Sequence, residues 1–250
     1  MRGPSHCYFC LVLSVLLAVL TGSSRSSLVS RLSSQSGLVL SPDSPGYEER
    51  RKVMNAACTA QPAVIVVPNT ERDIAVILEV AREEGLEVSV RSGGHSYTCT
   101  NIKEGGLHID MRAFTQLELV RTSQSDTGLA LKLGPGLIWG DVLDFAPPER
   151  FSFPHGQCRS VGVGGYLLGG GVNWLGSYNK YGYGAEHVLA MRVVLATGEI
   201  GVVDSQATRI EFPIPRFIPH AGNNNLFTAL RGAGSSLAVV TEFLYMIYET

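Results

Sequence analysis

The placement of glycine constrains this chain of 250 residues more than any other feature. The sequence holds 28 glycines, well above the usual share of about 7%. They follow no fixed period, so neither a collagen-like repeat nor a flexible linker explains them. Ten of them lie between Gly156 and Gly184. Because glycine allows left-handed backbone and close approach to a ligand, this clustering predicts a loop region that wraps around a bound ligand.

The overall composition is that of a folded domain with a sizeable core. Hydrophobic residues make up 45% of the chain and charged residues 17%, which allows one large domain or two small ones. The net charge of −2 gives no electrostatic reason to expect nucleic acid or an anionic membrane surface as a partner.

The first residues have the pattern of a signal peptide, assigned here to residues 1–23. Arg2 precedes the apolar run Phe9–Leu20, which at twelve residues is shorter than the roughly 20 needed to span a bilayer. No later segment approaches that length, so no stable membrane span is expected. Residues 24–57 are interpreted as a low-complexity linker, and the mature protein is expected in the secretory pathway. The acid-free, serine-rich stretch Ser23–Ser41 leaves one alternative, a signal followed by an organelle transit segment.

Three cysteines, Cys58, Cys99 and Cys158, remain after the expected leader. One arrangement pairs Cys58 with Cys99 and leaves Cys158 free for other chemistry. The alternative is three reduced cysteines, and the sequence leaves both open.

Residues 58–250 predict an α+β domain, because strand and helix patterns mix without a strict alternation. A buried strand at Val64–Val67 precedes a helix capped by Thr70 and running to about Glu84, and a strand at Val88–Arg91 follows. Pro213, Pro215 and Pro219 predict an irregular loop. Further strands are expected at Leu107–Met111, Leu117–Val120, Leu129–Leu133, Val188–Leu195, Ile200–Val203 and Leu237–Tyr248, and helices at Leu137–Phe145 and Leu226–Arg231.

Two motifs carry the candidate chemistry: RSGGHSY at Arg91–Tyr97 and GQCRSVGVGGYLLGGG at Gly156–Gly171. Glycine pairs let backbone amides cradle a pyrophosphate, and each motif places a nucleophile, His95 or Cys158, beside such a cradle. This combination suggests a phosphate-bearing cofactor that is also held covalently, and flavin adenine dinucleotide (FAD) fits best. No complete nicotinamide fingerprint, P-loop, HExxH zinc site or GxSxG elbow occurs.

These motifs, with KYGYGAEHV (Lys180–Val188) and LFTALRGAG (Leu226–Gly234), resemble those of the berberine-bridge-enzyme-like FAD-linked oxidases. That family belongs to the vanillyl-alcohol-oxidase superfamily and has a PCMH-type FAD-binding domain. The similarity runs from about Gln61 to Phe243. It implies two α+β subdomains with the cofactor between them.

The resemblance also implies residue roles. His95 would be joined to the flavin 8α-methyl carbon and Cys158 to ring carbon C6, whereas the alternatives are a polar turn residue and a buried structural thiol. A valine at Val161 resembles members that use O₂, which makes it a possible oxygen gate. Tyr97 and Tyr166 are expected to be packing residues, and no metal site is expected. The other expected cofactor-binding residues are Arg91, Ser92, Gly93, Gly94, Ser96, Gly162, Val163, Gly164, Gly165, Gly169, Gly170 and Val240.

The function that follows is an FAD-dependent oxidoreductase acting on a small molecule. It would oxidise an alcohol or carbohydrate C–OH by hydride transfer to flavin N5, with O₂ as the electron acceptor and no nucleic acid partner. The alternative is a non-catalytic secreted flavin-binding domain, or a fragment without a substrate site. Members of the family continue into a substrate domain, and Leu237–Tyr248 would otherwise leave apolar surface uncovered, so a fragment is expected.

Overall fold

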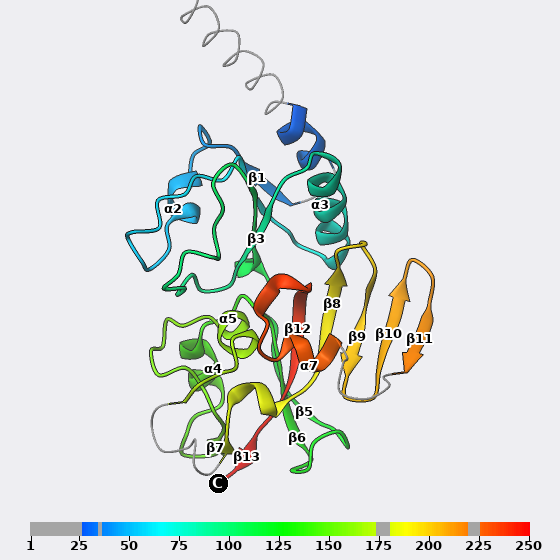
Figure 1. Cartoon of the computed structure of the whole chain (residues 1–250). Helices are drawn as coiled ribbons and strands as arrows, with labels where there is room; N and C mark the ends of the chain where they lie inside the picture. The colour runs from blue at the N-terminus through cyan, green and yellow to red at the C-terminus, as the bar shows by residue number, and fades with distance from the viewer. Residues whose placement is uncertain (1–26, 35–36, 174–180, 220–225) are drawn as a thin grey trace, which may run out of the picture.

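The computed structural model describes residues 27–34, 37–173, 181–219 and 226–250. The predicted signal peptide, residues 1–23, lies outside them. Two large β-sheets, each with its own helices, and one small two-stranded sheet form the described part of the chain (Figure 1). This is a mixed α+β fold, as the sequence predicts. No helix in the described ranges combines the length and the apolar character that crossing a membrane requires.

The first sheet has four strands in the order β1-β2-β4-β3. Its strands are β1 (Leu38–Leu40), β2 (Val64–Val67), β4 (Leu107–Asp110) and β3 (Val88–Arg91), and only β1 runs antiparallel to its neighbour.

Helix α3 (Glu71–Glu83) covers one face of this sheet. The sequence predicts its start correctly, because Thr70 and Asp73 form a capping box: the Thr70 hydroxyl accepts from the Asp73 amide, and the Asp73 carboxylate accepts from the Thr70 amide. Ile74 and Ile77 of α3 are fully buried in the core of this subdomain.

The second sheet has seven antiparallel strands in the order β11-β10-β9-β8-β12-β6-β5. The expectation that the strand near the C-terminus leaves apolar surface uncovered is wrong. Strand β12 lies between β8 and β6, its residues Ala238–Thr241 are all buried, and the rest of the strand alternates between half-buried and buried side chains. The strands are β5 (Leu117–Arg121), β6 (Leu129–Leu133), β8 (Val188–Leu195), β9 (Ile200–Asp204), β10 (Ala207–Phe212), β11 (Arg216–Pro219) and β12 (Ala238–Met246).

Shorter elements pack around the second sheet. A core centred on the buried Trp139 joins them to β6, β8 and β12. They are the helices α4 (Trp139–Phe145), α5 (Val163–Leu168) and α7 (Leu226–Leu230), and a small sheet of β7 (Phe151–Ser152) and β13 (Tyr248–Glu249).

The two subdomains share one core. Val194, Ile200 and Val239 of the second sheet pack in the same cluster as Ile74 and Ile77 of α3. This contact fixes the angle between the sheets and leaves the space between their loops open.

Two regions differ from the sequence-based expectations. The stretch expected to be a linker, residues 24–57, carries a helix over 27–33, strand β1 and helix α2 (Tyr47–Arg51). Leu28 and Leu32 are buried against α3, and β1 pairs with β2, so hydrophobic burial and strand pairing order this stretch. The irregular loop expected around Pro213–Pro219 is instead the hairpin of β10 and β11, which turns through a cis Phe212–Pro213 bond.

Candidate functional site

A cavity of about 630 Å³ opens between the two subdomains. This volume lies within the roughly 300–1,000 Å³ typical of ligand pockets. Its walls come from the loop after β3, from α5 and the residues just before it, and from β12. The expected site residues that line it are Ser92, Gly93, Gly94, His95, Ser96, Val161, Gly162, Gly164, Gly165, Gly169 and Val240.

Four of the expected cofactor-binding residues do not line the cavity: Arg91, Cys158, Val163 and Gly170. Val163 is a core residue of α5 with no exposed surface. Gly170 has a φ of 98° and so serves the turn that ends α5. Arg91 and Cys158 are considered below.

The two glycine motifs meet at Gly93 and Gly162. A Cβ atom added to Gly93 would lie 2.5 Å from the Gly162 nitrogen, and one added to Gly162 would collide with the Gly93 nitrogen. Backbone therefore packs on backbone here, which only glycine permits. The Ser92 hydroxyl donates to the Pro135 carbonyl oxygen at 2.5 Å and ties the first loop to the second subdomain.

The loop after β3 presents unused hydrogen-bond donors to the cavity. Within the described ranges, the backbone amides of Gly93, Gly94, His95 and Ser96 donate to no protein acceptor. Successive backbone amides without a protein acceptor can bind an anion, so this part of the cavity wall is suited to an anionic ligand. The cavity lining holds no Asp or Glu that would repel such an anion.

His95 lies against the loop that carries Cys158. Its Nε2 is 3.0 Å from the Ser160 hydroxyl oxygen, and no partner at Nδ1 is found in the described chain. Cys158 is a free, exposed thiol two residues before Ser160. A turn closed by the Val161 amide donating to the Cys158 carbonyl oxygen at 3.0 Å shapes this second loop. The structure thus places His95, which lines the cavity, in contact with the loop that carries Cys158.

Arg91 supports the first loop from behind. Its side chain is buried, and Nη1 donates to the carbonyl oxygens of Arg50 (2.6 Å) and Lys52 (2.8 Å). A Cβ atom on Gly94, whose φ is 78°, would be 3.0 Å from the Arg91 guanidinium. Burial, with the nearby Arg112 cation, lowers the pKa of Arg91 from its usual high value. Arg91 therefore shapes the loop without reaching the cavity.

Two buried polar atoms of cavity-lining residues have no protein partner: Asn101 Oδ1 and Tyr166 Oη. The Tyr166 ring packs edge-on against Trp139, with centroids 5.1 Å apart. Burial raises the pKa of the Tyr166 hydroxyl far above its usual range, so it remains a hydrogen-bond donor. Tyr166 therefore packs through its ring, as expected, and also presents a hydroxyl group that can donate a hydrogen bond. Tyr97, also expected to pack, is 80% exposed.

Sequence reasoning missed Ser160 and Asn101. Ser160 lies between Cys158 and the glycine pair at Gly164, and Asn101 follows His95 by six residues. In both cases a polar residue within a motif-bearing loop was the available signal. The glycine cradle, the free amides and the unpartnered polar atoms fit a cofactor with phosphate groups and an aromatic ring system, such as FAD.

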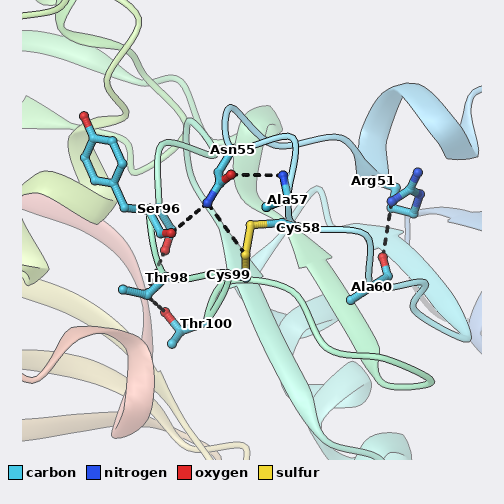
Figure 2. The surroundings of a disulfide bond; sticks show 10 residues. Arg51, Asn55, Ala57, Cys58, Ala60, Ser96, Thr98, Cys99 and Thr100 are labelled. Carbon is cyan, nitrogen blue, oxygen red and sulfur yellow. Dashed lines mark hydrogen bonds between the residues drawn. A yellow bond between two sulfur atoms is a disulfide. The ribbon is translucent and has the colours of Figure 1, made fainter.

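The disulfide joins Cys58 to Cys99, with Cα atoms 5.3 Å apart. This confirms one of the two arrangements that the sequence leaves open. It attaches the segment before β2 to the His95 loop (Figure 2).

Comparisons with known proteins point to flavin enzymes. A family model described as an FAD binding domain matches residues 62–204. The chain is 31% identical over 224 residues to (R)-6-hydroxynicotine oxidase of Paenarthrobacter nicotinovorans, which covers 90% of this chain and 44% of that protein.

Solved structures give the same result. Glucooligosaccharide oxidase from Acremonium strictum, which carries a 6-S-cysteinyl, 8α-N1-histidyl FAD, matches with a TM-score of 0.71 and 26% identity over 89% of this chain and 43% of that one. The BBE-like 1 protein of Physcomitrella patens shares the fold with a TM-score of 0.73 and 24% identity, over 88% of this chain and 44% of that one. The chain thus spans less than half the length of these relatives.

Proposed function

We propose that this chain, which belongs to the family of FAD binding domains, is the flavin-binding part of a berberine-bridge-enzyme-like oxidase whose FAD is attached at His95 and Cys158. The observation that carries the proposal is the row of four unpaired amides, Gly93 to Ser96, beside the His95 ring. These donors would bind the pyrophosphate while the imidazole reaches the flavin ring.

Ser160 would prepare His95 for attachment. When the His95 Nε2–H donates to the Ser160 hydroxyl oxygen, the neutral imidazole carries its lone pair on Nδ1. Nδ1 is then the nucleophilic atom. This agrees with the 8α-N1-histidyl link of glucooligosaccharide oxidase, a relative that is 26% identical.

Cys158 would supply the second link. Its thiol is exposed on the loop that contacts His95, and the cavity begins three residues later at Val161. Attachment there needs the thiol to turn toward the ring edge, which an exposed side chain can do without breaking the core. Two links would hold the ring at a fixed angle, and each would form by an effectively intramolecular attack of a side chain on the bound ring.

When bound, FAD supplies a two-electron acceptor at N5 that takes hydride from a substrate C–H bond and is then reoxidised by O₂. Val161 lines the cavity, and its small side chain would leave oxygen a path to the ring. We propose alcohols or carbohydrates as substrates, because a similar protein acts on glucooligosaccharides. The lining contains no carboxylate in the described residues, so no residue of this chain is proposed as the substrate base.

The test begins with covalent attachment. The chain is expressed with its flavin, denatured and separated on a gel, and flavin fluorescence is expected to migrate with the polypeptide. Fluorescence is expected to survive in His95→Ala and in Cys158→Ala and to vanish in the double variant. Protein that never binds a chromophore would refute the proposal.

Oxygen use is tested separately with Val161→Ile. Peroxide production is expected to fall while reduction of an artificial dye continues, because the added methylene narrows the path to the ring without altering hydride transfer. Unchanged rates with both acceptors would remove the role of Val161 and leave the attachment proposal intact.

A further inference from the structure

Residues 50–58, here called the strap, run along the outside of the His95 loop (residues 92–100). The Arg91 guanidinium at the base of the loop donates to the carbonyl oxygens of Arg50 and Lys52. The Met54 amide donates to the Gly94 carbonyl oxygen at 2.9 Å. The strap therefore holds the loop on the side that precedes His95.

The strap also holds the loop beyond His95 (Figure 2). The side-chain nitrogen of Asn55 donates to the Tyr97 carbonyl oxygen at 2.8 Å. The side-chain oxygen of Asn55 accepts from the Ala57 backbone amide at 3.0 Å. Cys58 is bonded to Cys99. His95 is thus bracketed by strap contacts on both sides along the chain.

Beyond His95 the loop has little else to fix its shape. In the described part of the chain the hydroxyl groups of Ser96, Thr98 and Thr100 bond only to one another, and Tyr97 is 80% exposed. Cys99 has a φ of 58° and is the one non-glycine residue with positive φ in the described chain. A side-chain-bearing residue avoids this conformation unless its surroundings impose it, and here the disulfide partner is the restraint.

We propose that Asn55 and the Cys58–Cys99 disulfide are positioning groups that hold the His95 loop in the conformation required for flavin attachment. The inference rests on the proposed function for the attachment step alone. In that step the imidazole loses its N–H proton and a C–N bond replaces an 8α C–H bond of the flavin. The flavin keeps the two electrons until O₂ takes them to form hydrogen peroxide. Because attack is intramolecular, its rate depends on how much of the time the loop is in place.

The first test separates positioning from folding. Asn55→Asp keeps the oxygen that accepts from Ala57 and removes the nitrogen that donates to Tyr97. The flavin-free 250-residue chain is incubated with saturating FAD, and modification of the His95 peptide is followed by mass spectrometry. Loss of one hydrogen bond is expected to slow attachment about fivefold. The control Gln124→Glu makes the same amide-to-carboxylate change in an exposed turn and is expected to match the wild type.

The second test needs no flavin. Chymotrypsin cleavage after the exposed Tyr97 is compared with cleavage after the exposed Phe145, which lies outside the strap contacts. The Tyr97 site is expected to be cut about fivefold faster in Asn55→Asp. It is expected to be cut roughly thirtyfold faster when both Cys58 and Cys99 are replaced by serine. The Phe145 site is expected not to change.

The outcomes are distinct. If Asn55→Asp attaches flavin and is cleaved after Tyr97 at the same rates as the wild type, the positioning role is overturned, whether or not the serine variant folds. Equal acceleration at Tyr97 and Phe145 would also overturn it, because the disulfide would then support the whole fold. If even the wild type acquires no flavin at His95, the proposed function fails, and selective Tyr97 cleavage still decides whether the strap holds the loop.

Discussion

His108 makes the stability of this fold depend on pH in a defined window. It lies on β4 with no exposed surface, and its Nδ1 is 2.8 Å from the Ser89 hydroxyl oxygen. Its Nε2 is buried without a hydrogen-bond partner. The nearby Asp110 carboxylate is already bonded by Arg50 and Arg112, so it offers little to a third cation.

Burial therefore lowers the pKa of His108 from 6.5 to about 4. Because the folded-state pKa lies below the unfolded one, the unfolded chain binds the proton more tightly. The stabilisation is complete above pH 6.5 and is lost as the pH falls toward 4. At about 1.4 kcal/mol per pKa unit, the loss amounts to about 3 kcal/mol of the free energy of unfolding.

Urea unfolding between pH 7.5 and 4.5 measures this loss. The free energy of unfolding of the wild type is expected to fall about 2.5 kcal/mol more than that of His108→Leu over this range, because the full loss is reached only below pH 4. His187, whose pKa is also lowered by burial, contributes in the same direction, and His187→Leu serves as the matched comparison. Parallel pH profiles for the wild type and His108→Leu would refute the reasoning.

Two further predictions concern the loops of the site. Gly93→Ala is expected to lower the free energy of unfolding by about 2–3 kcal/mol in thermal or urea unfolding, because the added Cβ would meet the Gly162 backbone. The control Gly165→Ala in α5 has open space around its Cβ and is expected to be neutral or slightly stabilising. Equal effects of the two variants would contradict the backbone contact. Ser160→Ala is expected to slow flavin attachment at His95 about fivefold at saturating FAD, and Ser160→Thr is expected to keep most of the rate. Attachment is followed by mass spectrometry of the His95 peptide. An unchanged rate in the alanine variant would remove Ser160 from the attachment step.

The elements that the sequence predicts correctly are those with local signals. Strands β2 and β3 have the predicted bounds, and α3 begins at the predicted cap. Both are predictable because a run of apolar residues or a capping residue is a signal contained within a few neighbouring positions. The hairpin of β10 and β11 was missed because three prolines normally break strands. β11 is an edge strand that pairs only with β10, and an edge position tolerates the missing amide hydrogen of proline.

The strap was missed for a different reason. Its residues show neither helical nor strand periodicity, and its order comes from partners far along the chain. Arg50 pairs with Asp110 at 2.8 Å, and the Asn55 side-chain nitrogen donates to the Tyr97 carbonyl oxygen at 2.8 Å. Such pairings depend on where the other elements of the fold place their atoms, so they cannot be predicted from the composition of the strap. The serine-rich stretch that precedes the strap therefore favoured a linker by composition alone.

The candidate site shows the same division between residue identity and residue geometry. The motifs identified His95 and Cys158, since a nucleophile beside a glycine cradle is visible in one short stretch of sequence. The backbone contact between Gly93 and Gly162 is what brings the two stretches together, and that contact depends on the shared core between the sheets. Arg91 illustrates the limit of motif reasoning: a cation beside a phosphate-binding loop suggests a ligand contact, yet its guanidinium is directed toward carbonyl oxygens of the strap. The loop is thus held by the strap, while the amides of Gly93 to Ser96 have no acceptor in the described residues and remain available to a ligand.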